Sequence, residues 1–154
     1  MNVQRIIQPD YDEGVDRKTL KVIRDRFLKV SQGRLQRTHA ALNGRQQLVL
    51  ELLPLLFHVN HPLLPGYVSH QAPYRIQGYE PSKVELAAAH RFSRSFQYRD
   101  EPRRAADIQS LFLMGSTGTV AHSERSDMDI WLCHRPDLPP AQLAELQRKC
   151  TLIS

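Results

Sequence analysis

The sequence has no hydrophobic run approaching the ~20 residues needed to cross a bilayer, and its first ten residues lack the apolar stretch of a signal peptide. Cysteine is scarce, since only Cys133 and Cys150 are present and no CxxC spacing occurs. A secreted disulfide scaffold is therefore excluded, and we expect both thiols to be reduced. Repeats and low-complexity tracts are also absent. Together these absences favour a soluble, cytoplasmic protein without a transmembrane segment.

The chain has 154 residues, of which 41% are hydrophobic and 24% are charged. That length allows one domain with a real core, without disulfide or metal staples. Charge is unevenly placed, because residues 1–50 hold ten Lys/Arg against five Asp/Glu and supply the whole formal charge of +5. A basic excess can attract nucleic acid, acidic partners or nucleotide phosphates. Its helical spacing, however, is more typical of a solvated helix face, formed by Arg17, Lys18, Lys21, Arg24, Lys29, Arg34 and Arg37.

Residues 1–15 show no sustained period and are interpreted as an irregular arm. Residues 16–100 form a helical part in this interpretation. Apolar residues recur there at steps of three and four, which predicts an amphipathic helix that breaks or bends near Gly33; they are Leu20, Ile23, Phe27 and Val30. A second helical stretch is expected from about Arg34, past Asn43 and Gly44, to Phe57. Its apolar end should be buried, and Pro54 should kink or end it.

The segment 58–81 is rich in proline, glycine and tyrosine, which predicts a long ordered loop. Ser82-Lys-Val-Glu85 has the spacing of a capping box and should open a helix that reaches about Phe96. Within residues 101–154, two short apolar strands are expected over 108–114 and 128–133, followed by an amphipathic helix over 141–152. The fold class predicted is α+β.

The chemistry-bearing segment lies between the two expected strands. The first strand ends in Gly115-Ser116, and Asp127-Met-Asp129 stands at the mouth of the second. A glycine lets the backbone approach a bulky anion, and Ser116 with the following amides can donate to phosphate oxygens. Strand side chains alternate faces, so the two aspartates point to one side as hard oxygen ligands for Mg²⁺. Framed by apolar residues, two such carboxylates repel each other unless a cation lies between them.

The run GSTGTVAHSERSDMDIWLCH resembles the catalytic motif of the class I bacterial adenylate cyclases, within the nucleotidyltransferase superfamily of the DNA polymerase beta type. The runs LLPLLFHVNHPLLPGYV and QRKCTLI also look like the N-terminal catalytic region of that family. The resemblance covers most of the chain, from about Leu20 to the end.

The resemblance implies a lyase that converts ATP to 3′,5′-cyclic AMP and pyrophosphate, by attack of the ribose 3′-hydroxyl on the α-phosphorus. Mg²⁺ is the implied cofactor and ATP the implied substrate. Position by position, the resemblance implies a triphosphate cradle at Gly115 and Ser116, metal ligation by Asp127 and Asp129, and a place for Ser126 next to the metal. Trp131 would sit near the nucleotide or brace the aspartates, and a packing role is the alternative. The implied fold is a helical N-terminal part packed on a small mixed sheet, with an incomplete nucleotidyltransferase core over 101–154.

Two departures from the family pattern bear on this interpretation. The family's loop after Gly-Ser is usually richer in serine, whereas Gly118 and Thr119 stand here. The superfamily also completes its metal site with a third carboxylate on a later strand, and full cyclases carry a regulatory C-terminal region. The resemblance therefore implies an N-terminal fragment of a longer enzyme.

Two other function classes stay open. One is another transferase of the same superfamily, which moves a nucleotide onto a separate hydroxyl. The other is a non-catalytic nucleic-acid or protein-binding module that uses the basic helices. Few aromatics are interleaved with the basic residues, so no DNA partner is expected. His58 and His61 lie three residues apart, but a zinc site would need more ligands at clear spacing and Pro62 breaks the helix there, so we expect both to be structural.

Overall fold

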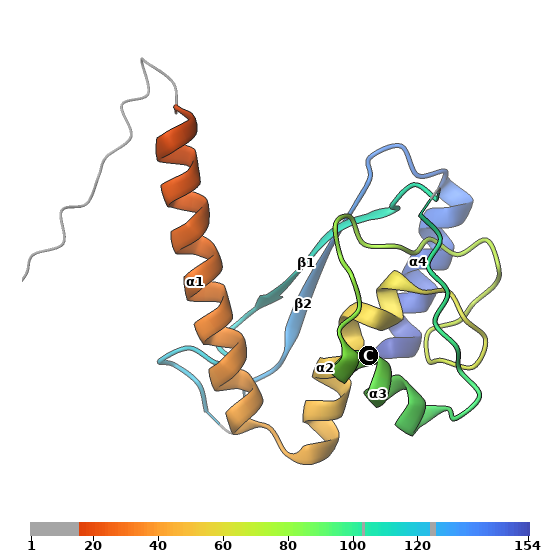
Figure 1. Cartoon of the computed structure of the whole chain (residues 1–154), viewed down its shortest axis with the longest axis horizontal. Coiled ribbons are helices and arrows are strands. Elements are labelled where there is room, and N and C mark those ends of the chain that lie inside the picture. Colours follow the sequence, from red (N-terminus) through yellow and green to blue (C-terminus); the bar gives the residue numbers. More distant parts are fainter. Residues whose placement is uncertain (1–15, 103, 124–125) are drawn as a thin grey trace, which may run out of the picture.

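A computed structural model describes residues 16–102, 104–123 and 126–154, so the arm expected over 1–15 lies outside the described residues. The α+β class is confirmed (Figure 1). None of the helices in the described part is both long and apolar enough to cross a membrane. The elements are, in order, α1 (Arg17–Ala41), α2 (Gly44–His58), α3 (Lys83–Phe92), β1 (Ile108–Met114), β2 (Asp129–His134) and α4 (Pro140–Ile153).

Helix α1 is continuous through Gly33, so the expected break at that glycine is wrong. It begins at Asp16, whose side chain accepts a hydrogen bond from the Thr19 amide at 2.7 Å. A single interior glycine costs only about 1 kcal/mol relative to alanine. The turns after Gly33 gain contacts with a distant loop through Arg34 and Arg37, which offset that cost.

The boundary between the first two helices lies at Asn43. Its side chain accepts from the amides of Arg45 and Gln46, and the Gln46 side chain accepts from the Asn43 amide, each at 3.1 Å. This capping box starts a new helix where the sequence pattern predicted a helix running past Asn43. Pro54 lies inside α2 without ending it, since the helix continues to His58.

The first core cluster joins α2 to α3. Leu55, Ala88 and Ala89 are fully buried in it, and Phe96 is 1% exposed. The predicted capping box of Ser82 and Glu85 is confirmed at the start of α3. The helix ends at Phe92, four residues before the expected end, because the chain leaves the helix and inserts Phe96 into this core.

Strands β1 and β2 pair in antiparallel fashion, with Met114 opposite Asp129 and Phe112 opposite Trp131. Where a mixed sheet was expected, the described residues form this two-stranded ribbon and a single parallel bridge between Ile76 and Ile108. One face of the ribbon packs against α2 and α4 in a second core cluster, made of Phe57, Ile76, Ile108, Leu138 and Leu146. Both cysteines are free thiols, as expected.

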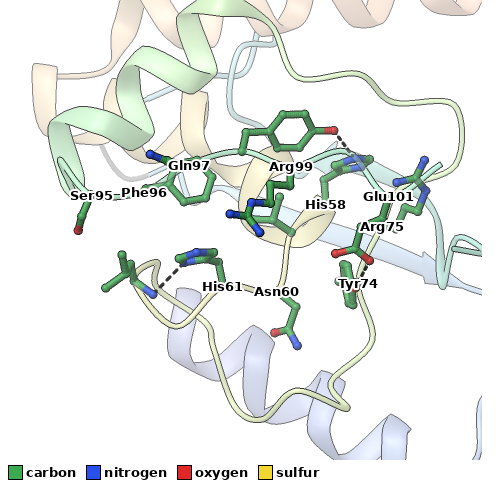
Figure 2. Close-up of a pocket in the computed structure, with 13 residues that line it drawn as sticks. His58, Asn60, His61, Tyr74, Arg75, Ser95, Phe96, Gln97, Arg99 and Glu101 are labelled. Carbon is green, nitrogen blue, oxygen red and sulfur yellow. Dashed lines mark hydrogen bonds between the residues drawn. The ribbon is translucent and has the colours of Figure 1, made fainter. Parts of the chain in front are cut away.

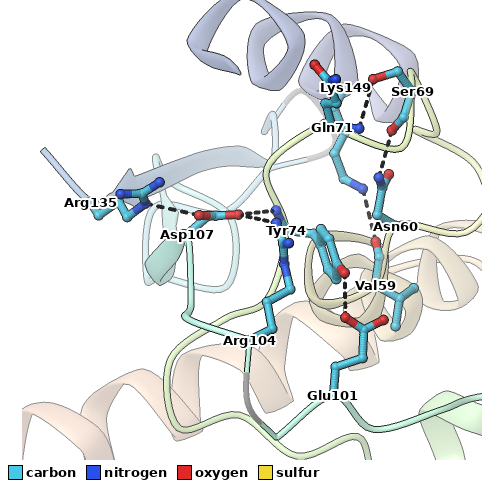
Figure 3. A network of polar contacts seen from close by, with 10 residues as sticks. All are labelled: Val59, Asn60, Ser69, Gln71, Tyr74, Glu101, Arg104, Asp107, Arg135 and Lys149. Atoms are coloured by element: carbon cyan, nitrogen blue, oxygen red, sulfur yellow. Dashed lines mark hydrogen bonds and ion pairs between the residues drawn. The ribbon is translucent and has the colours of Figure 1, made fainter. Parts of the chain in front are cut away.

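A buried carboxylate, Asp107, fastens the end of the ribbon that lies away from the Gly-Ser turn (Figure 3). It accepts from Arg104 Nη2 at 2.9 Å, from Arg135 Nε at 3.0 Å and from the Tyr74 amide at 3.2 Å. Charged hydrogen bonds of this kind are stronger than neutral ones. They join the long loop to the start of β1 and to the residue that follows β2.

The apolar stripe of α1 is exposed, although its spacing is that of a helix facing a core. Its four residues are 49 to 69% exposed: Leu20 58%, Ile23 49%, Phe27 52% and Val30 69%. Helix α1 stands beside the ribbon, and the Phe27 ring meets the Phe112 ring edge to face at 6.1 Å (Figure 1). Since Phe112, Trp131 and Asp129 share one face of the ribbon by strand alternation, that face is directed toward α1.

Lys149 of α4 is buried, with 1% of its surface exposed, and its Nζ donates to the Val59 carbonyl at 3.0 Å (Figure 3). Burial lowers the pKa of this ammonium from 10.5 to about 8. The unfolded chain therefore keeps a proton between pH 8 and 10.5 that the folded chain releases. Stability should rise with pH across this window, and the cost of charging the lysine is present in full below pH 8.

We predict that Lys149→Met changes this pH dependence. Between pH 8 and 10.5 the wild type should gain up to ~3 kcal/mol in its free energy of unfolding relative to the variant, because only the wild type carries the buried lysine. Urea unfolding at several pH values measures both free energies. Lys83→Met, at an exposed position, controls for other groups that titrate in the same range. A difference that stays constant with pH would contradict the prediction.

Candidate functional site

The Gly-Ser turn and the first residue of β2 meet at one end of the ribbon. Gly115 follows Met114, which pairs with Asp129, and adopts a φ of +75°. A Cβ at position 115 would lie 2.6 Å from Asp129 Oδ2 and 3.6 Å from the Asp127 carbonyl oxygen. Both the conformation and the close approach therefore require glycine. We call residues 114–119 the Gly115 loop.

Hydroxyl groups tie the Gly115 loop to the segment that precedes β2. The Oγ atoms of Ser116 and Ser126 lie 2.7 Å apart, and the Thr117 hydroxyl donates to the Asp127 carbonyl. Ser126 Oγ also accepts from the Ser123 amide at 2.9 Å. The structure thus brings Gly115, Ser116, Ser126 and the two aspartates together, although ten residues separate Ser116 from Ser126.

Asp127 and Asp129 are exposed, whereas Met128 and Ile130 between and after them are half-buried. The two apolar residues line a pocket of about 310 Å³ against α2 and α4. This alternation directs both carboxylates away from the core. Within the described ranges, neither carboxylate has an ion-pair partner, whereas Asp107 has two.

The donor set at this end of the ribbon suits Mg²⁺. It offers two exposed carboxylates, one at the start of β2 and one two residues before it. Mg²⁺ is usually bound by one or two carboxylates together with waters and substrate phosphates. In the described part of the chain, no group of three or more His, Cys, Asp or Glu could hold a metal ion. A metal bound by the two aspartates would therefore need waters or substrate phosphates as further ligands. Gly115 leaves the space beside Asp129 that a side chain would fill.

Trp131 is 61% exposed and belongs to neither core cluster. It lies two residues after Asp129 and opposite Phe112, so its indole is on the face of the ribbon that carries the Asp129 carboxylate. An exposed indole at this position can reach a ligand held by Asp129 and can report its binding by fluorescence.

Two arginines of α1 contact the Gly115 loop, and sequence reasoning missed both. Arg34 donates to the Thr117 carbonyl at 2.9 Å, and Arg37 donates to the Gly118 carbonyl at 2.7 Å. The helical spacing of the basic residues indicated a solvated face. Nothing in the sequence pattern showed that a loop some eighty residues later docks on the last turns of this helix.

Gly118 stands in the loop where the resembling family is usually richer in serine, and the structure explains why glycine is needed at this position. Its φ is +71°, and a Cβ would lie 2.1 Å from Thr38 Oγ1 and 2.5 Å from the Arg34 carbonyl oxygen. The loop backbone therefore approaches α1 more closely than any side chain at position 118 would allow.

The histidines singled out in the sequence line a different pocket, of about 450 Å³ (Figure 2). His58 Nδ1 accepts from the Ile76 amide at 3.2 Å, and His61 Nδ1 accepts from the Leu63 amide at 3.2 Å. Burial and the nearby Arg75 lower the pKa of His58, which favours the neutral ring. These contacts support the structural role expected for both rings.

Comparison with known proteins shows the family. The family described as "Adenylate cyclase NT domain" matches residues 19–154, and the chain belongs to it. The adenylate cyclase of Escherichia coli (strain K12) is 35% identical over 136 residues, and that of Salmonella typhimurium (strain LT2) is also 35% identical over 136 residues. The adenylate cyclase of Proteus mirabilis is 33% identical over 139 residues. The resemblance to the N-terminal region of the class I adenylate cyclases is therefore confirmed.

Each of these matches covers 87% of the chain but 16% of the relative. The chain thus corresponds to an N-terminal part of proteins several times as long. No solved structure matches it.

Proposed function

We propose that this chain is the catalytic N-terminal region of an adenylate cyclase, and that the Gly115 loop and the start of β2 form its nucleotide site. One observation carries the proposal: the glycine of the Gly-Ser turn and the carboxylate of Asp129 are in contact range, with room only for a hydrogen at position 115. This arrangement supports a site in which phosphate donors would lie next to metal ligands, as transfer chemistry on a nucleoside triphosphate requires. A nucleotidyltransferase-type core is the fold that this site fits.

Each residue has a role that follows from its position. Ser116 Oγ and the amides of the Gly115 loop would bind the triphosphate, and the Ser116–Ser126 pair would hold the turn against the segment before β2. Asp127 and Asp129 would hold Mg²⁺. Bound there, Mg²⁺ would lower the pKa of the attacking 3′-hydroxyl and neutralise charge on the pyrophosphate that leaves. Trp131, exposed on the same face as Asp129, would contact the nucleoside part of ATP.

Binding of ATP with Mg²⁺, measured by calorimetry, tests the site. We predict measurable affinity for the wild-type chain that depends on Mg²⁺, and at least a ~10-fold loss in the double variant Asp127→Asn, Asp129→Asn. The variant keeps the size of both side chains and removes their charge. It also stays folded in this account, because neither carboxylate has an ion-pair partner among the described residues.

Asp25→Asn with Asp137→Asn serves as the matched control, since both aspartates are exposed and lie outside the site. The control removes the same two charges and should bind ATP as the wild type does. Equal affinity in the wild type and the Asp127/Asp129 variant would defeat the metal-site assignment.

A further inference from the structure

The guanidinium group of Arg34 holds three peptide groups of the Gly115 loop. Its Nη2 donates to the carbonyl oxygens of Met114 at 2.6 Å and Gly115 at 2.7 Å, and its Nε donates to that of Thr117 at 2.9 Å. Arginine is the side chain suited to this, since its planar fork presents several donors in fixed directions. A single side chain of α1 therefore fixes both the entry and the centre of the loop.

The other carbonyls of the loop are also held from within the chain. That of Ser116 accepts from the Thr119 amide at 3.1 Å and from Thr119 Oγ1 at 2.7 Å, and that of Gly118 accepts from Arg37. Five successive carbonyl oxygens, 114 to 118, thus have donors. In the part of the chain that the structure describes, the Ser116 amide has no acceptor.

The direction of each loop carbonyl fixes the direction of the amide that follows it, because the trans peptide is planar. In each peptide unit the C=O of one residue and the N–H of the next point in opposite directions. Because the Gly115 carbonyl points at Arg34, the Ser116 N–H points away from α1. The Gly118 and Thr119 amides donate within the chain, to His122 Nδ1 at 3.4 Å and to the Ser116 carbonyl at 3.1 Å. The Ser116 amide is therefore the loop donor that this geometry directs outward, where it can donate to a bound anion.

Arg34 also contributes charge behind the loop. No carboxylate forms an ion pair with it within residues 16–102, 104–123 and 126–154. Among these residues its positive charge is met by peptide dipoles, and the field extends through the loop toward the side where the Ser116 amide points.

We propose that Arg34 is a positioning residue for the triphosphate: it orients the Gly115 loop so that the Ser116 amide faces the β- and γ-phosphates of ATP. This inference rests on the proposed function, which supplies the ligand. Arg34 does not touch the nucleotide in this proposal and acts through the loop.

The first experiment measures the loop without nucleotide. Hydrogen exchange of the peptide that covers residues 114–119 is compared in the wild type, Arg34→Gln and Arg26→Gln. Arg26 is an exposed arginine of the same helix, so its variant removes the same charge. Exchange should accelerate ~10-fold or more in Arg34→Gln alone, since three hydrogen bonds to a charged donor are lost. Unchanged exchange would overturn the proposal whatever ligand the site takes.

The second experiment compares ATP with adenosine, each with Mg²⁺, by Trp131 fluorescence. Arg34→Gln should bind ATP ~10-fold or more weakly and adenosine within about twofold of the wild type, because only ATP uses the loop. Arg34→Lys keeps the charge but not the fork, and should recover part of the ATP affinity. Arg26→Gln should bind both ligands as the wild type does.

The two experiments distinguish a failure of the Arg34 proposal from a failure of the proposed function. Equal loss of ATP and adenosine affinity in Arg34→Gln would show a general structural role and overturn the proposal. A wild-type chain that binds no ATP, with loop exchange still dependent on Arg34, would overturn the proposed function and with it the triphosphate role of Arg34.

Discussion

Asp129→Asn is expected to lower cyclic AMP synthesis by ~100-fold or more when residues 19–154 replace the matching region of the Escherichia coli adenylate cyclase. The reason is that an amide of nearly the same shape cannot supply the negative charge that holds a divalent cation. The loss should appear in kcat rather than only in KM, because charge neutralisation matters most as the pyrophosphate departs. Cyclic AMP formation in the hybrid enzyme, at saturating ATP and Mg²⁺, is the measurement.

Asp137→Asn in the same hybrid is the matched control. Asp137 is an exposed aspartate after β2 that pairs with Arg135 at 2.8 Å and lies outside the site. It should leave activity within about twofold, since exposed ion pairs contribute little. An active Asp129→Asn hybrid would contradict the assignment of Asp129, whereas an inactive parent hybrid would contradict the proposal that these residues form a cyclase site.

Gly118→Ala should give the largest change in stability among single substitutions at the site, about 2–4 kcal/mol of destabilisation. A non-glycine residue at a φ of +71° is strained, and the new methyl group would overlap the Arg34 carbonyl oxygen, which is part of the α1 backbone. The loop and the helix can relieve the overlap only by separating. Urea unfolding followed by circular dichroism measures the effect.

Gly44→Ala is the control for this substitution. Gly44 begins α2, and a Cβ there would meet no atom within 4 Å. Alanine at this position should be neutral or stabilise the protein by up to about 1 kcal/mol. If Gly118→Ala is as stable as Gly44→Ala, the close packing of the loop on α1 is wrong.

Local patterns predicted most of the secondary structure. The strand over 108–114 has the bounds expected from its apolar run, and the box of Ser82 and Glu85 starts α3 as predicted. These features depend on neighbouring residues alone, so the sequence contains what determines them. The end of the first helix was misplaced because the capping contacts of Asn43 outweighed the weak helix-breaking tendency of Gly33.

The site was predicted only in part, for a different physical reason. The spacing of the Gly-Ser turn and the aspartates identified the residues that the structure brings together, because strand alternation and a hairpin connection are local. The roles of Arg34, Arg37 and Thr38 depend on the docking of a helix from the start of the chain onto a loop near its end. Periodicity in α1 shows which residues share a face, but not what that face will meet.

The hydrogen bonds of Arg34 span 80 to 83 residues of sequence. The Gly115 loop therefore takes its order from a partner that is remote along the chain, and contacts of such long range are costly in chain entropy to close. The hairpin itself supplies donors to the Ser116 carbonyl, whereas the donors to the carbonyls of Met114, Gly115, Thr117 and Gly118 come from α1. The geometry of this loop is in this sense a tertiary property, because the bonds from Arg34 exist only when α1 lies against the turn.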